Sequence, residues 1–138
     1  MKANLVQIKG LSFSGKADSN HWVCIDGPKK FLGSEAASSP MELLLISLGG
    51  CTGSDVASIL NKKKVNLKDF EINIEADRAE NHPKVFTKIH IEYLFYGQEL
   101  NPKHLQRAIE LSLNKYCSVT MMLKPKVKIT SSYKIINK

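Results

Sequence analysis

The stretch SPMELLLISLGGC, residues 39–51, carries most of the information about the fold of this 138-residue chain. Ser39 is a favoured N-cap, Pro40 suits the first helical position, and Glu42 falls at the third, which together make a capping box. The apolar residues that follow lie on every side of a helix, which indicates burial on every side. We therefore predict a helix from this capping box to about Lys63, with its first half buried; three consecutive lysines at its end suit the helix macrodipole.

Two cysteines stand out. Cys51 ends the apolar run directly after Gly49 and Gly50, and Cys117 follows 66 residues later at the end of a second predicted helix. Because Gly costs about 1 kcal/mol relative to Ala inside a helix, adjacent glycines indicate close packing or access by another group. The pattern favours a redox pair, and inert buried thiols are the alternative. A position near a helix start would lower the pKa of Cys117.

Composition and charge disfavour several classes of protein. A hydrophobic content of 43% is too high for a disordered chain. The chain opens without an apolar signal segment, and the apolar run 41–50 is too short to span a bilayer, so we expect a soluble cytoplasmic protein with no membrane partner. The net charge is +7, but Arg78 and Arg107 are the only arginines and most lysines are scattered, so we expect no nucleic-acid partner.

Cysteine usage also disfavours structural disulfides and zinc. A secreted disulfide scaffold usually has a dense, even set of cysteines, whereas this chain has three. It contains no Cys-x-x-Cys motif, and its four histidines form no ligand pair near Cys51 or Cys117. The spacing predicts neither a metal site nor another cofactor. We interpret Cys24, in a predicted strand, as a packing residue.

The remaining patterns predict an α+β fold in a single domain, residues 1–138. Alternating or β-rich segments predict strands at 5–13, 21–26, 70–76, 88–95 and 127–133, with a turn at 14–20. A second helix begins at Asn101–Pro102. The order is ββ-α-ββ-α-β, and one small sheet cannot cover a helix that is apolar all round, so we expect a core shared between two copies of the chain.

Three motifs together resemble the OsmC/Ohr superfamily: residues 39–45 (SPMELLL), 48–52 (LGGCT) and the segments AIELS and YCSV within 108–119. The resemblance covers nearly the whole chain in element order and is nearer to the broad OsmC-like branch than to the organic-hydroperoxide-resistance branch. It implies an intertwined homodimer in which two central helices pack on strongly curved antiparallel sheets. It also implies thiol-dependent reduction of organic hydroperoxides, with Cys51 as peroxidatic cysteine, Cys117 as resolving cysteine and a dithiol, of dihydrolipoyl type, as reductant.

The chain departs from the best-characterised peroxidase branch around the helix start. That branch uses an N-terminal arginine to lower the thiol pKa and a glutamate directly after the proline to orient it. Here Met41 follows the proline, and residues 1–77 contain no arginine. Glu42 lies nine residues before Cys51, on roughly the opposite face of a helix with ~3.6 residues per turn, so we assign it to the capping box.

Activation of Cys51 therefore has no obvious source in the sequence. Lys29, Lys30 and Arg78 are the candidate cations, together with a residue from a second copy. Asp55, one helical turn after Cys51, would raise a neighbouring thiol pKa. The alternative function is an OsmC-fold binding or sensor module with little or no peroxidase activity.

Overall fold

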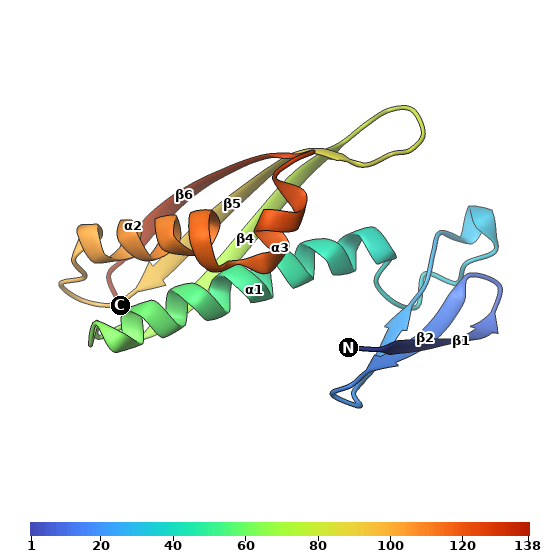
Figure 1. Cartoon of the computed structure of the whole chain (residues 1–138), viewed down its shortest axis with the longest axis horizontal. Helices are drawn as coiled ribbons and strands as arrows, with labels where there is room; N and C mark the ends of the chain where they lie inside the picture. The colour runs from blue at the N-terminus through green and yellow to red at the C-terminus, as the bar shows by residue number, and fades with distance from the viewer. The chain divides into compact units, whose positions relative to one another are not determined.

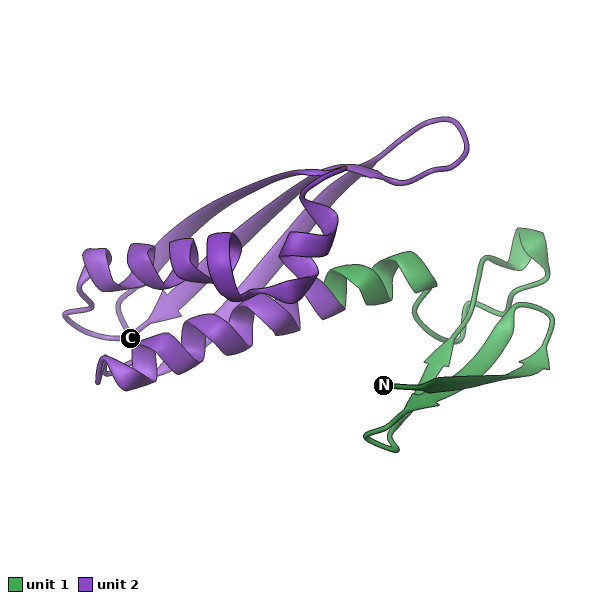
Figure 2. Ribbon diagram, viewed as in Figure 1, with its two compact units in different colours: residues 1–46 green, residues 47–138 purple.

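The computed structural model describes all 138 residues and divides into two compact units, Met1–Ile46 and Ser47–Lys138 (Figure 2). The boundary falls within helix α1, and each unit is described by itself. In chain order the elements are β1 (Ala3–Lys9), β2 (Ser12–Ala17), β3 (Trp22–Ile25), the 3-10 turn η1 (Lys29–Phe31), α1 (Pro40–Lys62), β4 (Asp69–Arg78), β5 (Phe86–Tyr96), α2 (Pro102–Leu111), the π-helical turn η2 (Ser112–Tyr116), α3 (Ser118–Leu123) and β6 (Lys128–Ile136). The α+β class is confirmed, whereas a single domain over residues 1–138 stays a prediction.

The first unit contains an antiparallel sheet in the order β1-β2-β3. The sequence predicted two strands here, and the expected strand 5–13 is wrong: it is broken at Gly10 and Leu11, and residues 14–17 of the expected turn belong to β2. Gly10 makes the early turn possible because its φ is +56°, a conformation that favours glycine. A Cβ at this position would also lie 2.2 Å from the carbonyl oxygen of Leu32.

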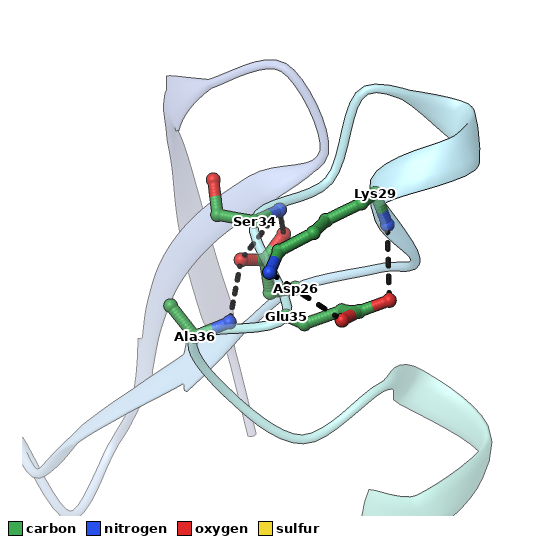
Figure 3. Close-up of polar contacts among 5 residues, drawn as sticks. All are labelled: Asp26, Lys29, Ser34, Glu35 and Ala36. Carbon is green, nitrogen blue, oxygen red and sulfur yellow. Dashed lines mark hydrogen bonds and ion pairs between the residues drawn. The ribbon is translucent and has the colours of Figure 1, made fainter.

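A buried carboxylate organises the loop after β3 (Figure 3). Asp26 is 2% exposed and accepts hydrogen bonds from the backbone N–H groups of Gly27, Ser34 and Ala36, at 2.7, 3.2 and 3.1 Å. These bonds hold its pKa below the usual value, the one from Ala36 most strongly. One side chain thereby fixes the loop that leads into α1.

The predicted capping box at the start of α1 is confirmed. The backbone N–H of Ser39 donates to the Glu42 carboxylate at 2.6 Å, and the backbone N–H of Glu42 donates to Ser39 Oγ at 3.4 Å. The hydrogen bond from the Ser39 backbone N–H lowers the pKa of Glu42 most, and the Ser39 side chain lowers it further. The helix ends at Lys62, one residue before the predicted end.

The second unit contains the sheet β4-β5-β6. Strands β4 and β5 pair antiparallel from Asp69↔Tyr96 onward, as their alternating sequences predicted. Strand β6 pairs parallel to β5, from Lys88↔Lys128 to Tyr96↔Ile136, so the expectation of purely antiparallel sheets is wrong for this edge. A parallel neighbour needs a long crossover, and the segment with α2, η2 and α3 supplies it.

The core of the second unit lies between this sheet and the helices, and Figure 1 shows α1 and α2 running along one face of the sheet. Alternate residues of β5 are buried: Ile89, Ile91, Tyr93 and Phe95. The helices contribute the buried side chains of Leu48, Val56 and Leu60 from α1 and of Leu105, Ala108 and Ile109 from α2. Helix α2 begins as predicted, since Asn101 Oδ1 accepts from the N–H of Lys103 at 3.0 Å.

Helix α1 is long and apolar enough to meet a length-and-composition test for a membrane span, although its apolar run 41–50 was predicted to be too short. Core helices of soluble proteins meet the same test. In α1, the buried Thr52 makes hydrogen bonds to Tyr93 and Ser112, and Asp55 accepts one from Ser112. The buried residues of α1 are Leu48, Thr52, Val56 and Leu60, which form one stripe along the helix, so the predicted burial on every side of its first half is wrong within the single chain.

Candidate functional site

The structure brings the two predicted site cysteines together and adds a carboxylate. The ligand atoms of Cys51, Asp55 and Cys117 all lie within 4.8 Å of one another. Cys51 and Asp55 come from successive turns of α1, whereas Cys117 lies between η2 and α3. We call these three residues the cysteine–aspartate cluster. None of the three cysteines forms a disulfide.

The glycines around Cys51 have different environments. A Cβ on Gly49 would lie 3.2 Å from Ile74 Cδ1 of β4, and one on Gly53 would lie 2.9 Å from Ile72 Cδ1. Gly49 therefore allows close packing of α1 on the sheet, whereas a Cβ on Gly50 would meet no atom within 4 Å. Cys51 itself is half-buried. The packing at Gly49 and the open space at Gly50 agree with the two roles expected for adjacent glycines, which are close packing and access by another group.

Cys117 is fully buried and caps α3. Its Sγ accepts a hydrogen bond from the backbone N–H of Thr120 at 3.4 Å. Burial raises the pKa of this thiol above its usual value, and Cys51 adds to the rise, while hydrogen bonds from Thr120 oppose it. The expected lowering at a helix start is therefore wrong, because desolvation outweighs the hydrogen bonds at the short helix α3.

A buried chain of hydroxyl groups leads to Asp55. Ser112 Oγ donates to Asp55 Oδ2 at 3.0 Å, which uses its one proton. Thr52 Oγ1, 2.9 Å from Ser112 Oγ, must then be the donor of that bond, and Tyr93 must donate its phenolic proton to Thr52 over 2.6 Å. Because each hydroxyl has one proton to donate, Tyr93 donates to Thr52, Thr52 to Ser112 and Ser112 to Asp55. Burial raises the pKa of Tyr93 to about 12, so the phenol keeps its proton.

An open pocket of about 390 Å³ begins at Asp55. Ile59, Leu111 and Tyr116 provide apolar surface in its lining, and Lys62 and Lys63 provide positive charge. Asp55 belongs both to this pocket and to the cysteine–aspartate cluster. Cys51 and Cys117 do not line the pocket, so Asp55 is the residue that connects it with the cluster.

The cations considered for Cys51 have other partners. Arg78 Nε donates to the carbonyl of Lys84 at 2.8 Å, in the β4–β5 connection. Lys29 forms an ion pair with Glu35 at 3.9 Å, and Lys30 lies 5.0 Å from the ring centre of Phe31. Both lysines belong to the first unit, and the structure assigns neither of them to Cys51.

The interpretation of Cys24 as a packing residue is wrong for this chain. Its side chain is exposed on β3, opposite Ser14 in the register. The apolar alternation around Cys24 suggested a covered strand, but β3 is exposed along most of its length. Cys24 is thus a free surface thiol outside the cluster.

From the sequence, Asp55 was expected only to oppose formation of a thiolate. No site role was predicted for Thr52, Tyr93 or Ser112. The spacing of Cys51 and Asp55, four residues apart on a helix, does place both on one face and was a usable signal. No local pattern links Thr52 to Tyr93 or Ser112, which lie 41 and 60 residues away. These contacts depend on tertiary packing.

The chain is similar to known proteins and solved structures over nearly its whole length. Residues 33–132 match the family described as OsmC-like protein. Protein YhfA of Escherichia coli K12 is 38% identical over 136 residues, which cover 99% of this chain and 98% of that protein. The crystal structure of a hypothetical protein from Aquifex aeolicus VF5 is 34% identical in sequence and matches with a TM-score of 0.87. The match covers 99% of this chain and 96% of the Aquifex chain.

A more distant structure shares the fold. It is described as an organic hydroperoxide resistance protein OsmC, a predicted redox protein, from Legionella pneumophila. Its identity to this chain is 16% and its TM-score is 0.72, with 96% of this chain and 95% of that chain covered.

Proposed function

The chain belongs to the OsmC-like protein family, and we propose that it is a thiol-dependent peroxidase that reduces organic hydroperoxides through Cys51 and Cys117. The observation that carries the proposal is the placement of a half-buried thiol against a fully buried one, from segments 66 residues apart in the sequence. A peroxidatic thiol must be reachable, and a resolving thiol must lie close enough to trap the sulfenic acid before further oxidation.

The reaction has three balanced steps. The Cys51 thiolate attacks the peroxide, the O–O bond breaks, and the products are an alcohol, after one proton is taken up, and a sulfenic acid on Cys51. The thiol of Cys117 then attacks that sulfur, an S–S bond forms, and water leaves with the thiol proton. A dithiol, of dihydrolipoyl type by resemblance to the family, finally reduces the disulfide and is itself oxidised.

Two features support an organic peroxide rather than hydrogen peroxide as the substrate. The pocket that begins at Asp55 has apolar side chains in its lining, Ile59 and Leu111 among them, which suit a hydrocarbon group. The Legionella protein that shares the fold is described as an organic hydroperoxide resistance protein. Both features agree with a role in oxidative stress.

A second candidate is a binding or sensor module, and one observation favours it. The charged group beside the two sulfurs is the carboxylate of Asp55, whereas the candidate cations Lys29 and Arg78 are bonded elsewhere. Glu42, the nearest counterpart of the catalytic glutamate of the peroxidase branch, is used by the capping box. In this alternative, Cys51 reacts slowly and reports on an electrophile without turnover.

A steady-state assay separates the two candidates. The reduced protein is mixed with cumene hydroperoxide and dihydrolipoamide, beside Cys51→Ser and, as a matched control, Cys24→Ser. The peroxidase proposal expects turnover that Cys51→Ser abolishes and Cys24→Ser preserves, with a Cys51–Cys117 disulfide found by peptide mapping. Stoichiometric oxidation without turnover favours the sensor, and an unreactive Cys51 contradicts the redox function altogether.

We also propose that the protein is a cytoplasmic homodimer. All large apolar side chains that are buried belong to the second unit, whereas Val6, Ile8, Trp22 and Leu32 of the first unit are 54–81% exposed. A sheet with so much exposed apolar surface is typical of an interface. A second copy of the chain is the partner that the OsmC-like family implies.

A further inference from the structure

We propose that the reduced cysteine–aspartate cluster is a binding site for a thiophilic divalent cation, Zn²⁺, with Cys51, Asp55 and Cys117 as its ligands. Two thiolates and a carboxylate are all ordinary zinc ligands. The sequence predicted no metal site, because it contains no Cys-x-x-Cys motif and no pair of histidines near Cys51 or Cys117. The fold instead assembles the site from one helical turn of α1 and a residue 62 positions after Asp55.

The distances fit a site that closes slightly around the ion. With zinc–sulfur bonds of about 2.3 Å, two thiolates on a tetrahedral ion lie about 3.8 Å apart. The ligand atoms here are within 4.8 Å of one another, so the two sulfurs must approach by about 1 Å at most, and a sulfur and the carboxylate oxygen by only slightly more. Cys51 is half-buried and can adjust its side chain, whereas Cys117 is enclosed. The fourth position would remain for water, as in zinc sites with three protein ligands.

Hydrogen bonds from neighbouring residues orient the proposed ligands, as is usual in protein metal sites. Ser112 donates to Asp55 Oδ2 and leaves the other carboxylate oxygen available, and the hydroxyl chain from Tyr93 through Thr52 keeps Ser112 in place. The N–H of Thr120 points at Cys117 Sγ and stabilises its charge. Outer hydrogen bonds of this kind orient ligands and increase metal affinity.

No positively charged group of the chain is paired with the cluster. When both thiols lose their protons to solvent and bind the ion, the three ligands carry three negative charges in a partly buried space. Asp55 takes part in none of the chain's ion pairs, which lie elsewhere on the surface. A divalent cation compensates this charge, and soft sulfur ligands select zinc over magnesium or calcium.

Metal binding and redox chemistry would exclude one another, because a disulfide has no thiolate to offer. The inference rests on the geometry of the cluster and not on peroxidase activity. Its test therefore uses no peroxide: reduced protein, free of reductant, is titrated with Zn²⁺ in competition with a chromophoric chelator, and Co²⁺ is used to detect thiolate-to-metal absorption.

We expect one ion per chain in the wild type and in Cys24→Ser, which removes only the exposed thiol. Ser112→Ala should weaken binding by ~10–100-fold, as loss of an outer partner does, and Cys51→Ser and Asp55→Asn should weaken it by more. Bound Zn²⁺ should also slow the alkylation of Cys51, as measured by mass spectrometry. Circular dichroism checks that each variant folds.

Three results would overturn the proposal: no binding by the reduced wild type, full binding by Cys51→Ser, or loss of binding in Cys24→Ser. Oxidation of the wild type to the disulfide provides a test without substitution, since it should abolish binding and reduction should restore it. A protein that binds zinc but does not turn over peroxide would support this site while contradicting the peroxidase proposal, so the two can fail separately.

Discussion

Thr52→Val tests the hydroxyl chain most directly, because valine keeps the shape of threonine and has a methyl group in place of the hydroxyl. In the wild type, Thr52 accepts from the fully buried Tyr93 phenol and donates to Ser112. The substitution leaves the phenolic O–H without a partner, and a buried unsatisfied group costs about 1–3 kcal/mol. Ser112 keeps its bond to Asp55, so we expect a total loss of about 2 kcal/mol.

The order of donors in this hydroxyl chain also predicts that substitutions of Thr52 and Tyr93 have non-additive effects on stability. Tyr93→Phe removes the phenol but leaves Thr52 bonded to Ser112, so it should cost only the net value of one hydrogen bond, about 1 kcal/mol. In the double variant no phenol is orphaned, so its cost should fall below the sum of the single costs by about 1 kcal/mol or more. Urea unfolding of all four proteins, reduced and at one concentration, measures this coupling. Costs that add to within about 0.5 kcal/mol would refute the chain.

Three further predictions concern other parts of the molecule. Glu42→Gln should change peroxide turnover by less than about tenfold, or roughly 1.4 kcal/mol in activation free energy, because Gln preserves the capping box; a larger loss at unchanged stability would make Glu42 catalytic. The lowered pKa of Asp26 means that its contribution to stability is present above the unfolded-state pKa and is lost as pH falls through the folded-state pKa. Asp26→Asn should therefore lower the unfolding midpoint at pH 7 and weaken its acid dependence, and an unchanged acid profile would argue against this role. Sedimentation at micromolar concentration should find a dimer, and a stable folded monomer would contradict the proposed assembly.

The sequence predicted elements whose signals are local. The capping box of Ser39 and Glu42 lies within four residues, and the alternating side chains of β4 and β5 give both the strands and their buried face. Gly10 was a weaker signal, because a single glycine inside an alternating pattern is compatible with a strand, a bulge or a turn. The close approach of the Leu32 carbonyl to Gly10, from a later loop, could not be foreseen.

Strand direction and the details of the site depend on contacts between distant residues. The parallel pairing of β6 follows from how the crossover packs, which alternation in β6 itself does not specify. The pairing of Cys51 with Cys117 was expected from the resemblance, but the raised pKa of Cys117 was not, because burial is a property of the folded chain. Asp26 likewise looked like an ordinary strand-end residue until its backbone partners were known.

Asp55 links the two chemistries proposed for the cluster. In the peroxidase reaction, Cys117 must lose its proton when it attacks the sulfenic acid, and burial makes that loss harder. The carboxylate of Asp55, within 4.8 Å of both sulfurs, is placed to accept that proton. A cation bound to the cluster would occupy the same carboxylate and both sulfurs. The residue that would assist resolution is thus also the one that would bind a metal, so the two proposals predict that Zn²⁺ and peroxide compete for the reduced cluster.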